Sequence, residues 1–102
     1  MSTLTISKNR EETKLTVCVV GRVDTTTAPQ LDDEISQSLE GIKELVLDLS
    51  QTDYVSSAGL RVLLSLYKTM NAKRGSFLIC SVKPEVYEVF DVTGLTDFFE
   101  IQ

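Results

Sequence analysis

The sequence has no histidine, and this absence removes the side chain that most often serves as a general base or metal ligand near neutral pH. It also lacks glycine-rich phosphate loops, since neither GxxxxGK(S/T) nor GxGxxG occurs in it. The residue types that remain make no credible active site. We therefore expect a protein that is not an enzyme and that uses no metal or cofactor.

Long hydrophobic runs and an excess of positive charge are missing as well. The runs VCVVG and ELVLDL fall far short of the roughly 20 residues that span a bilayer, and no basic segment followed by an apolar one opens the chain. Acidic residues outnumber basic ones by 15 to 10, whereas nucleic-acid binding needs clustered Lys and Arg. We expect a cytoplasmic protein that binds another protein, with no membrane and no nucleic acid among its partners.

Cysteine is scarce. Cys18 and Cys80 lie in LTVCVV and FLICSV, two runs typical of buried strands, and we expect small buried thiols in a reducing compartment. The 102 residues, 42% hydrophobic and 25% charged, have an ordinary composition for one globular domain. The prediction is a single domain over residues 1–102.

Alternating and helical patterns take turns along the first half of the chain. Residues 3–9 and 14–22 alternate like strands and are joined by the polar REET, which predicts a hairpin. Pro29 suits the first turn of a helix, and Gly41 suits its end. The apolar stripe expected for this helix is Leu31, Ile35 and Leu39.

The second half repeats the alternation. KELVLDLS (43–50) predicts a covered strand, followed by SQTDYV as a loop. A helix is expected from Ser57 to Gly75, with Lys73 and Arg74 in its last turn. Its apolar face is expected to be Leu60, Leu63, Leu64, Tyr67 and Met70.

Residues 76–82 predict a further strand, and Pro84 opens a short helix that turns Val86, Val89 and Phe90 inward and ends at Gly94. FFEI closes the chain as a short strand or a helical turn. This element order predicts an α/β fold with a mixed sheet of four to five strands, and with helices packed mainly on one face.

Two adjacent serines, Ser56 and Ser57, precede Ala58 and Gly59 where the long helix begins. Serine is a preferred N-cap, yet one cap needs only one hydroxyl. Glycine costs a helix about 1 kcal/mol relative to alanine, so its presence suggests that another backbone or a partner comes close. An exposed serine at a helix N-terminus also suits a phosphate group. The residue types alone leave capping and phosphorylation both open.

Three blocks of the sequence together resemble the STAS domain of anti-sigma factor antagonists. They are GRVDTTTAPQL, ELVLDLSQTDYVSSAGLRVLLSLYK and PEVYEVFDVTGLTDFFEI, and the resemblance covers about residues 14–101. It implies a STAS-like fold and a bacterial partner switch. In that family the unmodified antagonist binds an anti-sigma factor, which is also a serine kinase of the histidine-kinase-like ATPase fold, and so releases a sigma factor. Phosphorylation ends the binding, and a PP2C-type phosphatase resets it.

The resemblance also assigns residues. Aligning Gly59-Leu60 with the Gly-Leu of the family pattern places the phosphate acceptor at Ser57. Ser56, where the family often has Asp, is the alternative acceptor. The implied partner-binding residues are Asp24, Ser56, Ser57, Ala58, Gly59 and Arg61.

Three of the matched positions have more than one expected role. Asp24 would line the acceptor or cap the following helix. Asp48 would mainly anchor the loop that carries the serines. Gly59 would admit the partner or let its own helix pack on the sheet.

Two other functions stay open on the sequence. One is a STAS scaffold or transporter-associated subunit that works without phosphorylation. The other is a regulatory domain that binds a small anion or nucleotide at the helix N-terminus.

Overall fold

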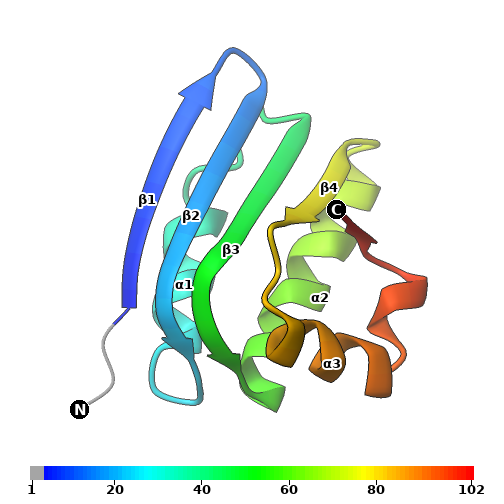
Figure 1. Cartoon of the computed structure of the whole chain (residues 1–102). Coiled ribbons are helices and arrows are strands. Elements are labelled where there is room, and N and C mark those ends of the chain that lie inside the picture. The colour runs from blue at the N-terminus through cyan, green and yellow to red at the C-terminus, as the bar shows by residue number, and fades with distance from the viewer. Residues whose placement is uncertain (1–3) are drawn as a thin grey trace.

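The computed structural model describes residues 4–102, which form one five-stranded sheet with three α-helices (Figure 1). The strands lie in chain order, and β1 pairs antiparallel with β2 whereas the later neighbours pair in parallel. The elements are β1 (Leu4–Glu11), β2 (Lys14–Val23), α1 (Ala28–Ser36), β3 (Glu44–Val55), α2 (Ser57–Ala72), β4 (Ser76–Cys80), α3 (Pro84–Val92), the 3-10 turn η1 (Leu95–Asp97) and β5 (Glu100–Ile101). The predicted α/β fold with a mixed sheet is confirmed.

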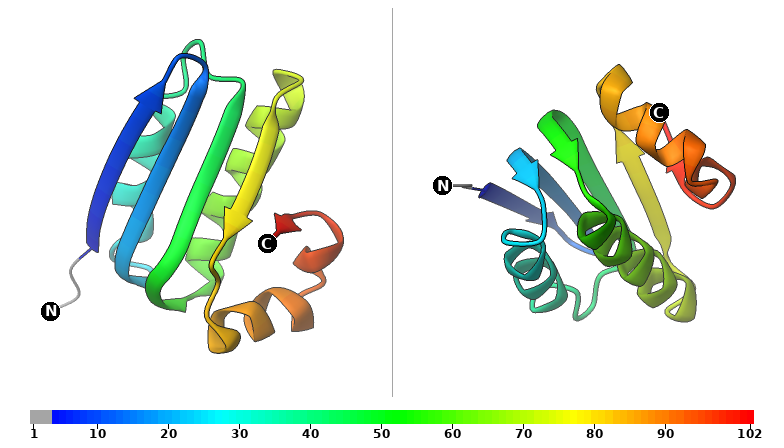
Figure 2. Two further views of the ribbon diagram at one scale, coloured as in Figure 1. Left: turned by 45° about the horizontal axis from the view of Figure 1, so that its top comes forward. Right: turned by 90° about the horizontal axis from the view of Figure 1, so that it is seen from below.

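The helices form two groups. α1 and α2 lie side by side on one face of the sheet, and α3 lies away from α1 and contacts β3 (Figure 2). The core fills the space between the sheet and the first two helices, where Val17, Leu47 and Ile79 are fully buried. Within residues 4–102, no helix is long and apolar enough to cross a bilayer.

The predicted hairpin is present but tighter than expected. Its strands continue through Arg10 and Glu11 to the pair Glu11↔Lys14, so the turn consists of Glu12 and Thr13 alone. Glu12 has a φ of 57°, the left-handed conformation that two-residue hairpin turns require. Thr3, which the sequence placed in the first strand, lies outside the described residues.

The prediction for the first helix is wrong at its end. α1 stops at Ser36, and Leu39 lies in the turns that follow, where Ile42 N donates to Leu39 O at 3.0 Å. Leu39 is nevertheless buried. The four-residue spacing therefore identified a core residue correctly, although a turn and not a helix brings it inward.

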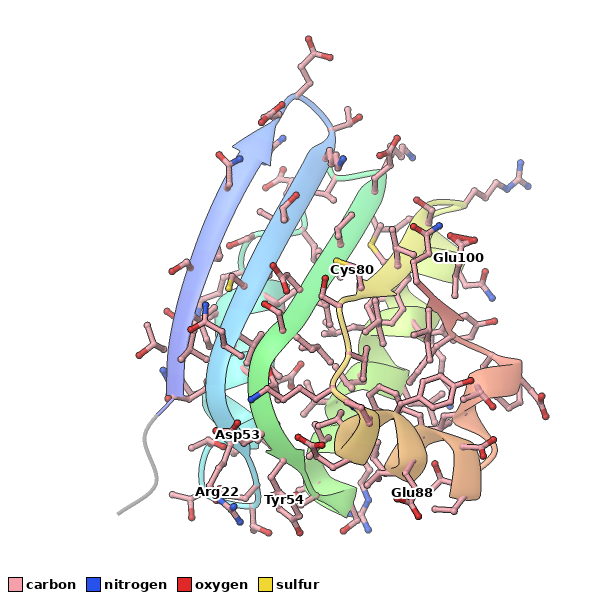
Figure 3. The ribbon with its side chains drawn as sticks, viewed as in Figure 1. Arg22, Asp53, Tyr54, Cys80, Glu88 and Glu100 are labelled. Atoms are coloured by element: carbon pink, nitrogen blue, oxygen red, sulfur yellow. The ribbon has the colours of Figure 1, made fainter. Side chains whose placement is uncertain are left out.

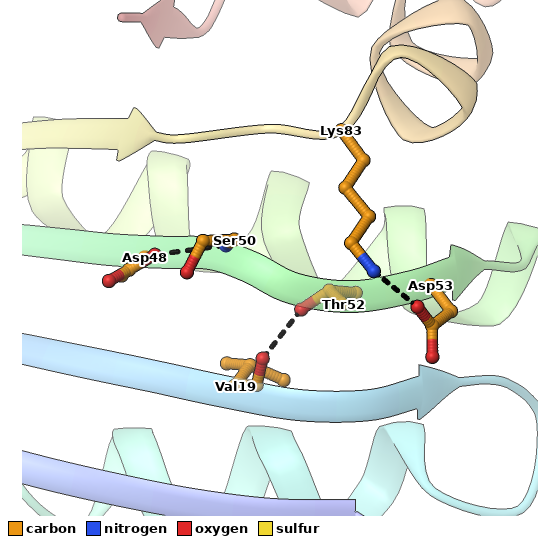
Figure 4. A network of polar contacts seen from close by, with 6 residues as sticks. All are labelled: Val19, Asp48, Ser50, Thr52, Asp53 and Lys83. Atoms are coloured by element: carbon orange, nitrogen blue, oxygen red, sulfur yellow. Dashed lines mark hydrogen bonds and ion pairs between the residues drawn. The ribbon is translucent and has the colours of Figure 1, made fainter.

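The prediction of a loop at residues 50–55 is also wrong. β3 runs on to Val55, and its second half pairs with β2 from Val20↔Gln51 to Val23↔Val55. Two register shifts on the way place extra residues in β3, as β-bulges do. Thr52 fits the buried interior because its hydroxyl donates to Val19 O at 2.8 Å (Figure 4).

The second helix differs from its prediction in both its buried face and its end. Leu63 and Met70 are buried as expected, and so is Leu66, which the stripe omitted. The stripe residues Leu60, Leu64 and Tyr67 are only half-buried. The helix ends at Ala72, so Lys73 and Arg74 follow its last turn instead of forming it.

Smaller corrections concern the C-terminal half. β4 ends at Cys80 and not at residue 82, and in α3 Val86 and Phe90 are buried whereas Val89 is half-buried. FFEI contains the short strand β5, one of the two forms expected.

The two cysteines are free and half-buried, not fully buried as predicted. They lie in register on either side of Asp48, because Cys18 of β2 and Cys80 of β4 both pair with this residue of β3. The alternation along β2 explains the exposure, since Val17 and Val19 face the helices and Cys18 faces the other side.

An aromatic cluster ties the C-terminal segment to the sheet. The ring of Phe99 lies 5.6 Å from Phe77, 5.8 Å from Phe90 and 5.9 Å from Tyr67, all in edge-to-face arrangements. Phe99 is 4% exposed, whereas its neighbour Phe98 is 57% exposed and meets only Tyr67 among these rings. One aromatic residue of the pair therefore belongs to the core.

Phe99→Ala is expected to lower the free energy of unfolding by about 3 to 5 kcal/mol, because it empties a site surrounded by three rings. Phe98→Ala serves as the matched control and is expected to cost at most about 1.5 kcal/mol, the value of one edge contact. Urea unfolding followed by circular dichroism measures both. Equal losses in the two variants would contradict this assignment of the core.

Candidate partner-binding site

The two serines lie where the carboxyl ends of β2 and β3 meet the start of α2. Ser56 N donates to Val23 O at 2.8 Å, which joins the helix start to the end of β2. The turn that leads from β2 into α1 begins at Asp24, the next residue. Parallel α/β sheets usually carry their functional loops at this end. The structure thus brings Asp24 and the serines to one edge of the sheet, as the sequence predicted.

The adjacent serines differ in what their hydroxyls do. Ser56 is the N-cap of α2, with an extended backbone, and its Oγ accepts from Gly59 N at 3.3 Å. Ser57 is the first residue of the helix and is exposed, and its hydroxyl makes no hydrogen bond within residues 4–102. One hydroxyl is therefore committed to the fold, and the other is presented to solvent.

Gly59 is buried because α2 packs closely on the sheet here. A Cβ at this position would lie 2.8 Å from Cγ1 of both Val23 and Val55, and 3.1 Å from Val23 O. Side chains do not tolerate such distances without a shift of their neighbours. Of the two roles open on the sequence, packing of its own helix accounts for the glycine.

The carboxylate of Asp24 organises the turn before α1. Its Oδ1 accepts from Thr26 N at 2.9 Å and from Thr27 N at 3.0 Å, and Asp24 O accepts from Ala28 N at 2.8 Å. Thr27, not Asp24, is the N-cap of α1. Asp24 is half-buried at the same edge of the sheet as the serines, so the geometry leaves it available as a lining residue.

Two other residues assigned to the site, Ala58 and Arg61, lie near the start of α2. Ala58 is half-buried in the first turn of α2, and Arg61 is exposed one turn further along. Asp48 does not anchor the serine-bearing segment, which corrects the expectation from sequence. Its Oδ1 accepts from Ser50 N at 2.9 Å and so holds the bulge in β3, six residues before Ser56 (Figure 4).

Two side-chain contacts near this edge were not predicted from the sequence. Lys83, the N-cap of α3, contacts Asp53 of β3, with 2.5 Å between Nζ and Oδ1. The hydrogen bond with Asp53 raises the pKa of Lys83 above its ordinary value, so the lysine stays charged at neutral pH. Arg22 stacks on Tyr54, with its guanidinium carbon 4.4 Å from the ring centroid (Figure 3). A contact between strand ends depends on the register, which the two bulges hide from sequence patterns.

Within residues 4–102, the site presents the hydroxyl of Ser57 on a surface, without a metal site or a base beside it. Among residues 4–102, no three His, Cys, Asp or Glu side chains come together as a metal site would require. Ser57 has no base bonded to it in this part of the chain. A reaction at Ser57 Oγ thus needs a base and a phosphoryl donor from another molecule.

Comparisons with known proteins identify the family of this fold. The family model of the STAS domain matches residues 5–102. The protein BtrV of Bordetella bronchiseptica, provisionally named an anti-sigma factor antagonist, is 39% identical over 85% of this chain and 76% of its own. The anti-sigma-B factor antagonist of Listeria monocytogenes is 30% identical over 93% of this chain and 84% of its own. An anti-sigma factor antagonist from Mycobacterium paratuberculosis has a similar crystal structure, with a TM-score of 0.87, 27% identity, and coverage of 97% of this chain and 85% of that one.

Because the two serine hydroxyls have different roles, we expect their removal to affect stability differently. Ser56→Ala is expected to lower the free energy of unfolding by about 1 kcal/mol, because Gly59 N loses its acceptor. Ser57→Ala is expected to leave it unchanged or slightly higher, because alanine is the better helix former. Denaturant unfolding of the two variants measures the difference. A larger loss in Ser57→Ala would reverse the assignment of the cap.

Gly59→Ala is expected to destabilise the protein by about 1 to 3 kcal/mol through overpacking, in spite of alanine's higher helix propensity. Thermal unfolding checks this, with Ala58→Gly as a control that lowers helix propensity in the same turn and adds no atoms. If Gly59→Ala were instead as stable as the wild type, close packing would not explain the glycine.

Proposed function

Because the chain belongs to the STAS domain family, and because similar proteins are anti-sigma factor antagonists, we propose that it binds an anti-sigma factor and so releases a sigma factor. The proposed partner is a serine kinase of the histidine-kinase-like ATPase fold. A PP2C-type phosphatase is proposed to remove the phosphate that this kinase adds. The chain itself acts without catalysis. Its binding surface comprises Asp24, Ala58, Arg61 and the two serines, with Gly59 setting the position of the helix beneath them.

The observation that carries the proposal is the exposed hydroxyl of Ser57, which makes no hydrogen bond within residues 4–102, beside the hydroxyl of Ser56, which caps the helix. Phosphorylation of Ser57 would leave the N-cap bond intact, so the fold could accept the group. Phosphorylation of Ser56 would place the group on the atom that caps the helix. We therefore assign Ser57 as the acceptor and keep Ser56 as the alternative.

The physical effect of the modification falls on the interface. A phosphate adds a charge of about −1.5 to −2, and the first turn of α2 favours negative charge through its free N–H groups. A partner surface shaped for a neutral hydroxyl would have to desolvate that charge without a matching cation. A mismatch of about 3 to 4 kcal/mol would weaken binding by two to three orders of magnitude.

The first test incubates the protein with ATP, magnesium and, one at a time, the purified kinases of this ATPase fold from the same genome. Intact-mass and peptide mass spectrometry are expected to show one phosphate in wild type and in Ser56→Ala, and none in Ser57→Ala. The phosphorylated protein is expected to bind the kinase about 100-fold or more weakly than the unmodified protein, which calorimetry measures.

Three results would revise the proposal. A phosphate lost only in Ser56→Ala would move the acceptor. Tight binding without phosphorylation by an active kinase would favour the phosphorylation-independent scaffold. Phosphate or nucleotide retained by the protein alone would favour an anion-binding regulatory domain.

A further inference from the structure

A stacked pair of exposed residues lies at the same end of the sheet as the serines. Arg22 and Tyr54 occupy paired positions of β2 and β3 and are both exposed. Val23, one residue after Arg22, accepts through its backbone O from the N of Ser56, two residues after Tyr54, and Ser57 follows. Figure 3 shows both side chains at the edge where α2 begins. The pair therefore borders the surface that presents Ser57.

The stack fixes the arginine and leaves its hydrogen-bonding capacity unused. The guanidinium carbon lies over the Tyr54 ring, 4.4 Å from its centroid, so the cation contacts the aromatic face. The N–H donors of a guanidinium lie in its plane, and those of Arg22 make no hydrogen bond within residues 4–102. An arginine that is already ordered loses less conformational freedom when it binds.

No acidic group of the described chain neutralises this cation. Within residues 4–102 the structure contains one ion pair, between Lys83 and Asp53. Asp53 is the residue directly before Tyr54, and Lys83 holds its carboxylate. The chain carries a net charge of −5, and within residues 4–102 Arg22 is the one cation held over an aromatic ring.

We propose that Arg22, stacked on Tyr54 beside the serine-bearing helix, is a specificity contact that pairs with an acidic side chain of the partner anti-sigma factor. This inference rests on the function proposed above and extends its surface to the other side of the helix start. The contact is formed by the planar donors of the guanidinium, and the tyrosine ring sets their direction. A carboxylate on the partner matches this geometry, because it accepts two parallel N–H groups from arginine.

The test compares charge reversals at two positions in the unmodified protein. Arg22→Glu is expected to weaken binding to the anti-sigma factor that binds wild type by about tenfold or more, and to reduce the dependence of the association rate on salt. Lys68→Glu makes the same change in net charge on the exposed surface of α2, eleven residues after Ser57, and is expected to change binding less than about twofold. Surface plasmon resonance at low and high salt measures both.

Two further variants separate geometry from charge. Arg22→Lys keeps the charge but loses the planar donors, and it is expected to recover only part of the binding that Arg22→Glu loses. Tyr54→Phe keeps the ring and is expected to bind like wild type, whereas Tyr54→Ala frees the arginine and weakens binding by about threefold to tenfold. NMR follows the stack without a partner, because the ring shifts the Arg22 side-chain resonances upfield in wild type and in Tyr54→Phe.

The possible failures are distinguishable. Equal binding of Arg22→Glu and Lys68→Glu would overturn the contact while the proposed function stood. Unshifted Arg22 resonances in wild type would overturn the orienting role of Tyr54. If no anti-sigma factor bound the wild-type protein, the proposed function would fail, and this inference would fail with it.

Discussion

The close approach of α2 to the sheet at Gly59 is the constraint on which the functional end of the molecule depends. With no side chain at this position, the helix rests against Val23 and Val55, the last residues of β2 and β3. The contact fixes the level at which α2 begins, and the bond from Ser56 N to Val23 O follows from it. A bulkier residue would lift the first turn and move both serines. The position of the exposed hydroxyl is thus set by packing beneath it.

Around this contact, nearly every polar group of the edge serves local structure. Asp24 holds the turn into α1, Ser56 caps α2, and Asp53 pairs with Lys83 at the start of α3. These bonds connect the three helices to the ends of the strands. Within residues 4–102, the hydroxyl of Ser57 and the donors of Arg22 and Arg61 remain outside this network. A surface whose own needs are met in this way can offer its remaining groups to a partner.

The sequence predicted the types and order of the elements because each core-facing position repeats with the period of its element. The prediction failed where pairing with a neighbouring strand, and not the residue types of the segment, decides its structure. The polar stretch 50–55 forms a strand because β2 offers it a parallel edge and bulges turn its side chains outward. The motif located the serines, and their different roles could not be predicted because capping depends on one backbone angle. The stack of Arg22 on Tyr54 needed the bulged register, which no local pattern encodes.

The strand order has a consequence for how this fold can arise. Each strand pairs with the strand that precedes it in the chain, from β1 through β5. During synthesis from the N-terminus, every new strand therefore meets an edge that has already emerged, and no strand has to be inserted between two others. The sheet can grow in one direction, with α1 forming the connection from β2 to β3 and α2 the connection from β3 to β4. The ends of β2 and β3, together with the start of α2, are complete before β4 is made, so the serine-bearing edge can be among the first parts of the molecule to reach its final arrangement.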